Sequence, residues 1–199
     1  MKALISMCAH GQDLKKRLAV VDVKRAYFYA PARREIYVQI PVEDRVPGDE
    51  DKVGALDFSL YGTRDAAQNW AHCYGEVLIK AGFVKGIASS CNFHHKSRDN
   101  SLTCHGDDFL ILGTAADLQW TISILGSKFE IKADILGPEE NFSKEVRILN
   151  RTIRWRRGGI EYEPDPRHAT TIIKLSLIHI SEPTRLLSIA FAGFCLKKK

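Results

Sequence analysis

Two adjacent carboxylates, Asp107 and Asp108, directly precede the apolar run Phe109–Leu112. The surrounding residues Leu102–Leu112 have the pattern of two extended arms, which predicts a hairpin with the acids at its turn. Neighbouring carboxylates repel each other, and partial burial raises that cost unless a cation or a proton neutralises them. A divalent metal ion would do this best, whereas a solvated Gly-Asp-Asp turn without function is the alternative.

A third carboxylate, Asp22, lies near the end of a second apolar, β-branched run, Ala19–Val23. The pattern is that of a strand that carries an acid to its own end. On neighbouring strands of one sheet, Asp22, Asp107 and Asp108 would offer hard oxygen ligands for magnesium, with positions left for substrate phosphates. The sequence therefore predicts a two-metal site for phosphoryl transfer.

Three sequence blocks around these acids occur in order along the chain. They are Val21–Phe28 (VDVKRAYF) with its continuation Glu35–Pro41 (EIYVQIP), Leu60–Trp70 (LYGTRDAAQNW) and His105–Asp108 (HGDD). The blocks resemble the Asp-Val-Lys-x-Ala-Phe strand, the Leu-Tyr-Gly-Leu-Lys-Gln-Ala-Pro-Arg-x-Trp segment and the Tyr-Val-Asp-Asp turn of reverse transcriptases from copia-type LTR retrotransposons. The resemblance covers about residues 1–155.

The resemblance implies an RNA-directed DNA polymerase that works with two Mg²⁺ ions, or with Mn²⁺ in their place. Asp22 and Asp107 would ligate the ions, and Asp108 would support the pair. The implied partners are an RNA template, a DNA primer, dNTPs and the integrase and ribonuclease H of the retrotransposon polyprotein. The implied location is intracellular, in cytoplasmic particles or in the nucleus.

Matching positions also imply contacts with the incoming nucleotide. These positions are Val23, Tyr27, Tyr61, Gly62 and Arg64. The ring of Tyr27 would lie under the sugar and exclude a 2′-hydroxyl, with a core aromatic as the alternative. Gly62 would let the backbone approach the substrate closely, and Arg64 stands where the family has a lysine that could contact phosphate or template.

Several features depart from the family pattern. His105 replaces tyrosine, Gly106 replaces valine, Ala67 replaces proline and Asp65 replaces glutamine. We also expect the fingers and thumb to be incomplete, because fingers strands do not precede Asp22 and thumb, connection and ribonuclease regions do not follow. A catalytically dead, truncated remnant that binds nucleic acid weakly is therefore the alternative function.

The pattern of elements predicts an α+β fold, a polymerase palm-like antiparallel sheet backed by helices. We expect a palm over 1–155, a hairpin and the start of a thumb-like helix over 156–174, and a separate tail over 175–199. Helices are expected at Met1–Gln12, at Arg64–Ala81, after a cap at Thr114 or Asp117, and from Pro164 to Lys174. Strands are expected at Arg17–Lys24, Glu35–Ile40, Cys91–Lys96, Phe129–Lys132 and Val146–Trp155, with a Gly158-Gly159 turn into Ile160–Tyr162.

The tail begins with Leu175–Arg185 (LSLIHISEPTR), which resembles a translated sequencing-library adapter. We expect residues from about Leu175 onward to be an assembly artefact without selected structure, with a genuine amphipathic tail as the alternative. The tail carries +3 of the formal net charge of +5, leaving +2 for the other 174 residues. Global charge is thus a weak indication of nucleic-acid binding.

A local basic cluster remains when the charge of the tail is left out. Its residues Arg151, Arg154 and Arg156 could contact nucleic-acid phosphates, with a solvated strand face as the alternative. The five cysteines are scattered, without a Cys-x-x-Cys pair, and predict free thiols. A zinc-binding structural domain is the remaining alternative, with ligands drawn from His72, Cys73, Cys91, His94, His95, Cys104 and His105. The sequence has no apolar run of 18 residues, so no membrane span is predicted.

Overall fold

The computed structural model describes residues 1–10, 15–163 and 165–176. It divides into two compact units, Met1–Glu163 and Pro164–Lys199. The first unit contains the helices α1 (Lys2–Ala9), α2 (Ala66–Lys80) and α3 (Ala115–Gly126), with short 3₁₀ turns at Ala26–Tyr29, Val42–Asp44 and Lys96–Arg98. Its strands are β1 (Lys16–Val23), β2 (Tyr37–Gln39), β3 (Val53–Ala55), β4 (Val84–Lys85), β5 (Asn92–His95), β6 (Asn100–His105), β7 (Asp108–Thr114), β8 (Ile131–Leu136), β9 (Glu145–Ile148), β10 (Arg151–Arg156) and β11 (Gly159–Glu163). The predicted α+β class is confirmed.

The main sheet has six strands in the order β4-β5-β6-β7-β1-β8, and every neighbouring pair is antiparallel. Strand β1 is central, between β7 and β8, and its residues Leu18–Val21 are all buried. A strand whose two faces are both covered reads as a continuous apolar run rather than an alternating one. This is why Leu18–Val21 carries no polar residue.

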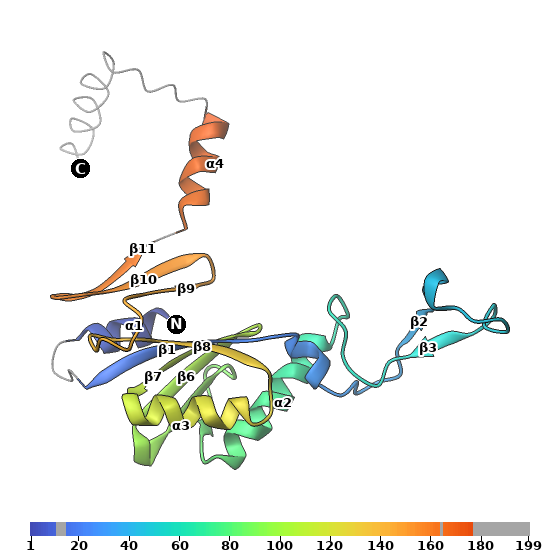
Figure 1. The fold of residues 1–199 in the computed structure, drawn as a ribbon, viewed down its shortest axis with the longest axis horizontal. Helices are drawn as coiled ribbons and strands as arrows, with labels where there is room; N and C mark the ends of the chain where they lie inside the picture. The colour runs from blue at the N-terminus through green and yellow to red at the C-terminus, as the bar shows by residue number, and fades with distance from the viewer. Residues whose placement is uncertain (11–14, 164, 177–199) are drawn as a thin grey trace. The chain divides into compact units, whose positions relative to one another are not determined.

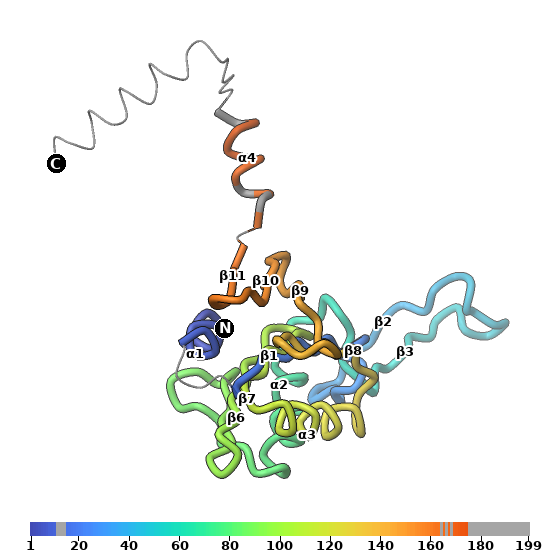
Figure 2. The backbone as a smooth tube through the Cα atoms, turned by 60° about the vertical axis from the view of Figure 1, so that its left-hand side comes forward, coloured from blue at the N-terminus to red at the C-terminus, as the bar shows by residue number. Residues whose placement is uncertain are grey.

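The two faces of the main sheet bury separate hydrophobic cores. One core joins Val21 and Phe109 to Trp70 of α2 and Leu118 of α3. The other core lies on the opposite face, where α1 and the sheet of β9, β10 and β11 cover β1 and β7 (Figure 1). Figure 2 shows the same order of layers, with α2 and α3 on one side and α1 on the other. The buried residues of the core on the α1 side are Ile5, Cys8, Leu18, Val20, Leu110, Leu112, Leu136, Val146, Ile148 and Ile153.

The helix boundaries agree with the predicted signals. Helix α2 ends at Lys80, and Gly82 follows in the left-handed region with φ +93°. Helix α3 begins after Thr114, whose hydroxyl oxygen accepts a hydrogen bond from the backbone N–H of Asp117 at 3.3 Å. Of the two predicted caps, Thr114 is therefore the one used.

Three parts of the fold differ from the prediction. No strand was expected at β3, but it pairs with β2 in a hairpin that extends away from the main sheet (Figure 1). The two-residue strand β4 was not expected at all. The predicted run Val146–Trp155 is interrupted at Leu149 and Asn150, whose φ values are +49° and +58°. Two left-handed residues in succession reverse the chain between β9 and β10. These two strands pair with each other, and with β11 they form a separate three-stranded sheet.

The second unit contains helix α4 (Pro166–Ser176), which confirms the helix predicted from Pro164. The Asp165 carboxylate accepts a hydrogen bond from the backbone N–H of Arg167 at 3.0 Å, as a helix N-cap does. The adapter-like residues from 177 onward lie outside the described residues, so the expectation for them stays a prediction. None of the described helices is long and apolar enough to cross a membrane.

Replacing Gly82 with alanine is expected to lower the free energy of unfolding by about 1–2 kcal/mol, because a left-handed backbone is unfavourable for a residue with a Cβ. The added Cβ would also lie 2.9 Å from Nε2 of His95, whose ring packs against Phe83 and Trp120 and cannot easily move away. Urea denaturation followed by circular dichroism measures the change.

The matched control is Gly158→Ala, since a Cβ at Gly158 meets no atom within 4 Å. We expect this variant to stay within about 0.5 kcal/mol of the parent. Equal losses in the two variants would contradict the assignment of Gly82 as the conformational stop of α2.

Candidate active site

The two adjacent acids lie at the hairpin that joins β6 to β7. His105 and Asp108 are the last opposed pair of these strands, so Gly106 and Asp107 form a two-residue turn. Gly106 has φ +66°, whereas Asp107 is not among the residues with positive φ. This is the pattern of a type II′ turn, which favours glycine at its first central position. The predicted hairpin is confirmed.

The turn is anchored to the core beneath it. The backbone carbonyl of Gly106 accepts a hydrogen bond from Nε1 of Trp70 at 2.8 Å and another from the Cys104 thiol at 3.4 Å. Trp70 is 1% exposed and belongs to α2. The position of the acids therefore depends on a helix far away in the sequence.

Asp22 lies directly opposite Asp108 on the neighbouring strand β1. The backbone N–H of Val23 donates to the Asp107 carbonyl at 3.1 Å, which makes Val23 and Asp107 a hydrogen-bonded pair. Asp22 and Asp108 then form a non-hydrogen-bonded pair, in which the Cα atoms lie about 4.5 Å apart and the side chains are closest. The predicted placement of the acids on neighbouring strands is confirmed.

Each carboxylate makes the ionisation of its neighbours less favourable. Burial, then the charge of Asp107 and then that of Asp22, raise the pKa of the half-buried Asp108 to about 6, while His105 acts in the opposite direction. A carboxyl group with this pKa is partly protonated near neutral pH. The acids therefore oppose one another's ionisation, as expected of carboxylates arranged to receive a cation.

The donor set fits a divalent metal by its chemistry, because three carboxylates are hard oxygen ligands of the kind that Mg²⁺ and Mn²⁺ prefer. Across the described residues, however, no three His, Cys, Asp or Glu side chains are arranged to hold a metal ion. Asp22, Asp107 and Asp108 thus share one end of two strands without closing around a common point.

The same finding bears on the zinc alternative, whose candidate ligands all lie within the described residues. Nδ1 of His94 lies 2.9 Å from the Ser101 hydroxyl, and the His95 ring packs edge-on against Trp120. Among the described residues these candidate ligands do not gather into a metal-binding group, so this fold gives the zinc-binding alternative no support.

Two tyrosines predicted to contact the nucleotide lie together beside the turn. The ring centroids of Tyr27 and Tyr61 are 4.3 Å apart, and Phe28 packs edge-on against Tyr61 at 5.7 Å. Burial, followed by the charge of Asp107, raises the pKa of the Tyr61 hydroxyl. The structure therefore brings this aromatic pair within electrostatic reach of Asp107.

The other predicted nucleotide contacts are placed differently. Val23 is 1% exposed, so its side chain belongs to the core and its N–H is already bonded to Asp107. Gly62 is exposed with φ +91°, which only glycine adopts freely. Arg64 is exposed and lines a cavity of about 430 Å³ with Arg34, Asp65 and Gln68, and none of the three acids lines this cavity.

The three arginines predicted to contact nucleic acid lie on β10, where two of them meet carboxylates. Arg154 pairs with Glu145 at 2.6 Å, with Glu163 at 2.5 Å and with Glu161 at 3.6 Å. Arg156 pairs with Glu161 at 2.7 Å. Arg151 lies over the Tyr162 ring, 5.6 Å from its centroid. Phosphate binding by these arginines stays a prediction, and for Arg154 and Arg156 it would compete with the glutamates.

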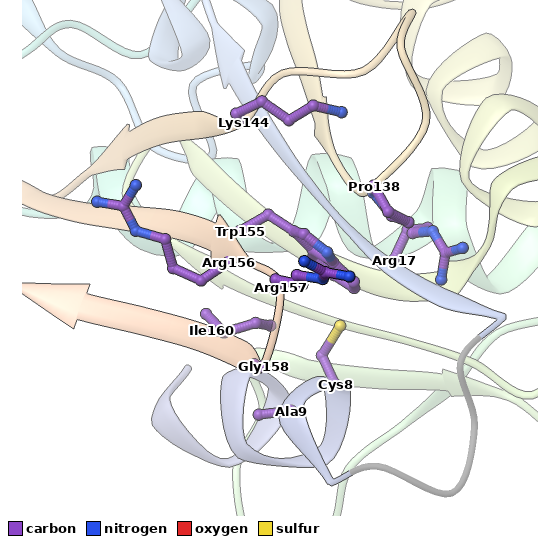
Figure 3. Close-up of a pocket in the computed structure, with 11 residues that line it drawn as sticks. Cys8, Ala9, Arg17, Pro138, Lys144, Trp155, Arg156, Arg157, Gly158 and Ile160 are labelled. Carbon is purple, nitrogen blue, oxygen red and sulfur yellow. The ribbon is translucent and has the colours of Figure 1, made fainter.

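A separate cavity of about 730 Å³ lies between α1, the start of β1 and the β10–β11 turn (Figure 3). Arg17 is at its rim, and it is five residues from Asp22 along β1, or about 16 Å. The Arg17 guanidinium binds Glu139 through two nitrogens, at 2.9 and 2.7 Å. This cavity is thus distinct from the acids.

The sequence-based interpretation missed the residues that hold the turn. Trp70 closes the second sequence block, and Cys104 precedes the third, yet neither was expected to hold the turn. Trp70 was visible as part of the apolar stripe of α2. Only the fold shows that its indole N–H reaches Gly106, because the two residues are 36 positions apart.

Comparison with known proteins agrees with this geometry. The family model described as reverse transcriptase (RNA-dependent DNA polymerase) matches residues 2–143. The chain is 25% identical over 158 residues to the retrovirus-related Pol polyprotein from transposon TNT 1-94 of Nicotiana tabacum, covering 77% of this chain and 12% of that protein. It is 27% identical over 158 residues to the truncated transposon Ty1-A Gag-Pol polyprotein of Saccharomyces cerevisiae, covering 78% of this chain and 13% of that protein.

A solved structure of apo telomerase from Candida tropicalis aligns with 80% of this chain and 35% of its own, with a TM-score of 0.47 and 9% identity. At that score the similarity carries no argument.

An antiparallel sheet that presents acids from two adjacent strands, with helices on its other face, is the architecture of a nucleic-acid polymerase palm. Since the family model matches most of its length, the chain belongs to the reverse transcriptase (RNA-dependent DNA polymerase) family. It spans about an eighth of the length of the polyproteins named above.

The raised pKa of Asp108 predicts a pH-dependent stability. Between about pH 4 and pH 6 the folded protein holds a proton on Asp108 that the unfolded chain has lost, so stability falls as pH rises through this window. Asp108→Asn removes that loss. Allowing for solvent screening, we expect the variant to be more stable than the parent by about 1–2 kcal/mol near pH 8 without divalent ions, and nearly equal to it near pH 4.

Denaturant titrations at the two pH values measure the difference. Asp134→Asn is the matched control, because Asp134 is an exposed carboxylate on β8, the strand that pairs with the other edge of β1. A stabilisation of the control as large as that of Asp108→Asn would show that net charge, rather than the acid cluster, is responsible.

Proposed function

We propose that the chain is the catalytic palm of an RNA-directed DNA polymerase that transfers nucleotides by a two-metal mechanism. The observation that carries the proposal is the direct opposition of Asp22 and Asp108 on β1 and β7, with Asp107 in the turn beside them, in a chain of the reverse transcriptase family. Three carboxylates at one end of a sheet have little structural value of their own, because they repel one another.

In this proposal Asp22 and Asp107 hold the two ions, and Asp108 supports the pair. When bound, Mg²⁺ or Mn²⁺ would lower the pKa of the primer 3′-hydroxyl and neutralise charge on the leaving pyrophosphate. The Tyr27–Tyr61 pair offers an aromatic surface next to Asp107 for the sugar and base of a dNTP. Gly62 leaves the backbone accessible, and the exposed Arg64 is available to phosphate or template.

The proposed partners follow from the reaction and from the relatives. They are an RNA template, a DNA primer, dNTPs and the other parts of a retrotransposon polyprotein, including integrase and ribonuclease H. The relatives support the last of these, because they are named as Pol and Gag-Pol polyproteins. We propose an intracellular location, in cytoplasmic particles or the nucleus.

The second candidate is a catalytically dead remnant with weak nucleic-acid binding. It is favoured by one observation, that the described acids are not closed around a common metal position. The two candidates differ in whether Asp107 matters to a chemical reaction.

Asp107→Asn is expected to reduce primer extension by at least about 10²-fold, because it removes a charged group that acts in the transition state. The assay extends a labelled DNA primer on an RNA template at increasing Mg²⁺, with the full chain. The fold should persist, since Asp107 lies in a partly exposed turn where its backbone carbonyl makes the bond to Val23.

Asp134→Asn again serves as the control and should extend the primer at the parental rate. Extension by Asp107→Asn at the parental rate would refute the catalytic assignment. If parent and variant are both inactive while both melt cooperatively, the dead remnant is the correct candidate.

A further inference from the structure

Two cysteines lie opposite each other on the main sheet, one of them two residues before the Gly106–Asp107 turn. Strands β5 and β6 pair with Asn92 opposite Thr103, and one step further along this register places Cys91 opposite Cys104. The backbone N–H of Cys104 donates to the Cys91 carbonyl at 3.0 Å, so the pairing continues to this step. Both are free thiols in this structure.

The two thiols also share a neighbour on the same face of the sheet. Burial, followed by the charge of and hydrogen bonding with Cys104 and then Cys91, raises the pKa of the Tyr74 hydroxyl. Tyr74 is 2% exposed and belongs to α2. Because one buried hydroxyl lies within reach of both sulfur atoms, the two side chains point to the same place.

We propose that Cys91 and Cys104 form a reversible disulfide that acts on the acid turn. The opposed positions are a hydrogen-bonded pair, in which Cα atoms lie about 5.5 Å apart, within the range of natural disulfides. The Cβ atoms of such pairs are somewhat further apart than a relaxed disulfide needs. The bond would therefore be strained and easily reduced, a property of regulatory rather than structural disulfides.

The exposure of the two thiols sets the order of the reaction. Cys91 is exposed, whereas Cys104 is 4% exposed and burial raises its pKa to about 12. A peroxide would therefore oxidise Cys91 first, giving a sulfenic acid and one water when the oxidant is hydrogen peroxide. The Cys104 sulfur then attacks the Cys91 sulfur, and the hydroxyl group leaves with the Cys104 proton as a second water.

The disulfide would reach the acids through the Gly106 carbonyl. In the reduced protein this carbonyl accepts from the Cys104 thiol and from Trp70. Oxidation removes the S–H donor and draws the Cys104 sulfur toward Cys91. Of these two donors, only Trp70 would then still hold the turn that carries Asp107. This inference concerns the cysteines themselves and does not rest on the proposed polymerase activity.

The test is disulfide mapping of the full chain after treatment with hydrogen peroxide, with Cys195→Ser as the background. Trypsin can cut after Lys96 and Arg98, so Cys91 and Cys104 fall on different peptides, and a disulfide joins them. We expect most of the oxidised protein to show this linked pair by mass spectrometry, and mild dithiothreitol to separate it. Absence of the linked peptides, or preferential linkage of Cys91 to another cysteine, would overturn the proposal.

Two variants sharpen the result. Cys91→Ser, at an exposed position, should fold normally and abolish the link, whereas Cys73→Ser should leave it intact. Hydrogen exchange provides a second readout, because oxidation should speed the exchange of amides at residues 105–108 in the parent and not in Cys91→Ser. Linkage with unchanged exchange would refute the proposed action on the turn.

Discussion

The repulsion among Asp22, Asp107 and Asp108 is the constraint on which the rest of the structure depends. Two unit charges about 5 Å apart near a protein surface repel by about 3 kcal/mol, and the raised pKa of Asp108 is the sign of that cost. The acids cannot separate through the backbone, because Asp22 and Asp108 are opposed in the register of two central strands. Only a change of charge state or a bound cation relieves them. A fold that did not use these acids would be more stable if any one of the three carboxylates were replaced by a neutral residue.

The burial of β1 and β7 on both faces is what keeps the acids together. Leu18 and Val20 of β1 pack with Leu110 and Leu112 of β7 in one core, while Val21 and Phe109 enter the other. Each fully buried side chain of this kind contributes about 1.5–3 kcal/mol, so a few of them exceed the repulsion at the end of the strands. The layer of α1 and β9–β11 is therefore part of the site, although none of its residues lies beside the acids in the sheet. It fixes two strands whose ends could otherwise move apart.

Local patterns were sufficient to predict the elements that carry the acids, and insufficient wherever pairing decided the structure. The runs before Asp22 and after Asp108 are apolar enough to define β1 and β7, and Thr114 and Gly82 mark helix ends through chemistry that one residue supplies. Strand β3, by contrast, is three residues long and exists because β2 lies opposite it. The split of β9 from β10 depends on Leu149 in a left-handed conformation, which leucine rarely adopts. The partners of Arg154 come from both neighbouring strands, so a basic cluster in the sequence is a paired one in the fold.

The departures from the family pattern at the turn have a physical explanation. The turn is held by the carbonyl of Gly106, through Trp70 and Cys104, and a carbonyl is present whichever residue occupies the position. A glycine with φ +66° suits the turn, and the missing side chain leaves the acids where the strands place them. His105 is exposed and opposite Asp108, where its charge favours the ionised carboxylate rather than opposing it. Neither departure displaces an acid from its strand. The two departures therefore leave unchanged both the opposition of Asp22 and Asp108 in the sheet and the place of Asp107 in the turn.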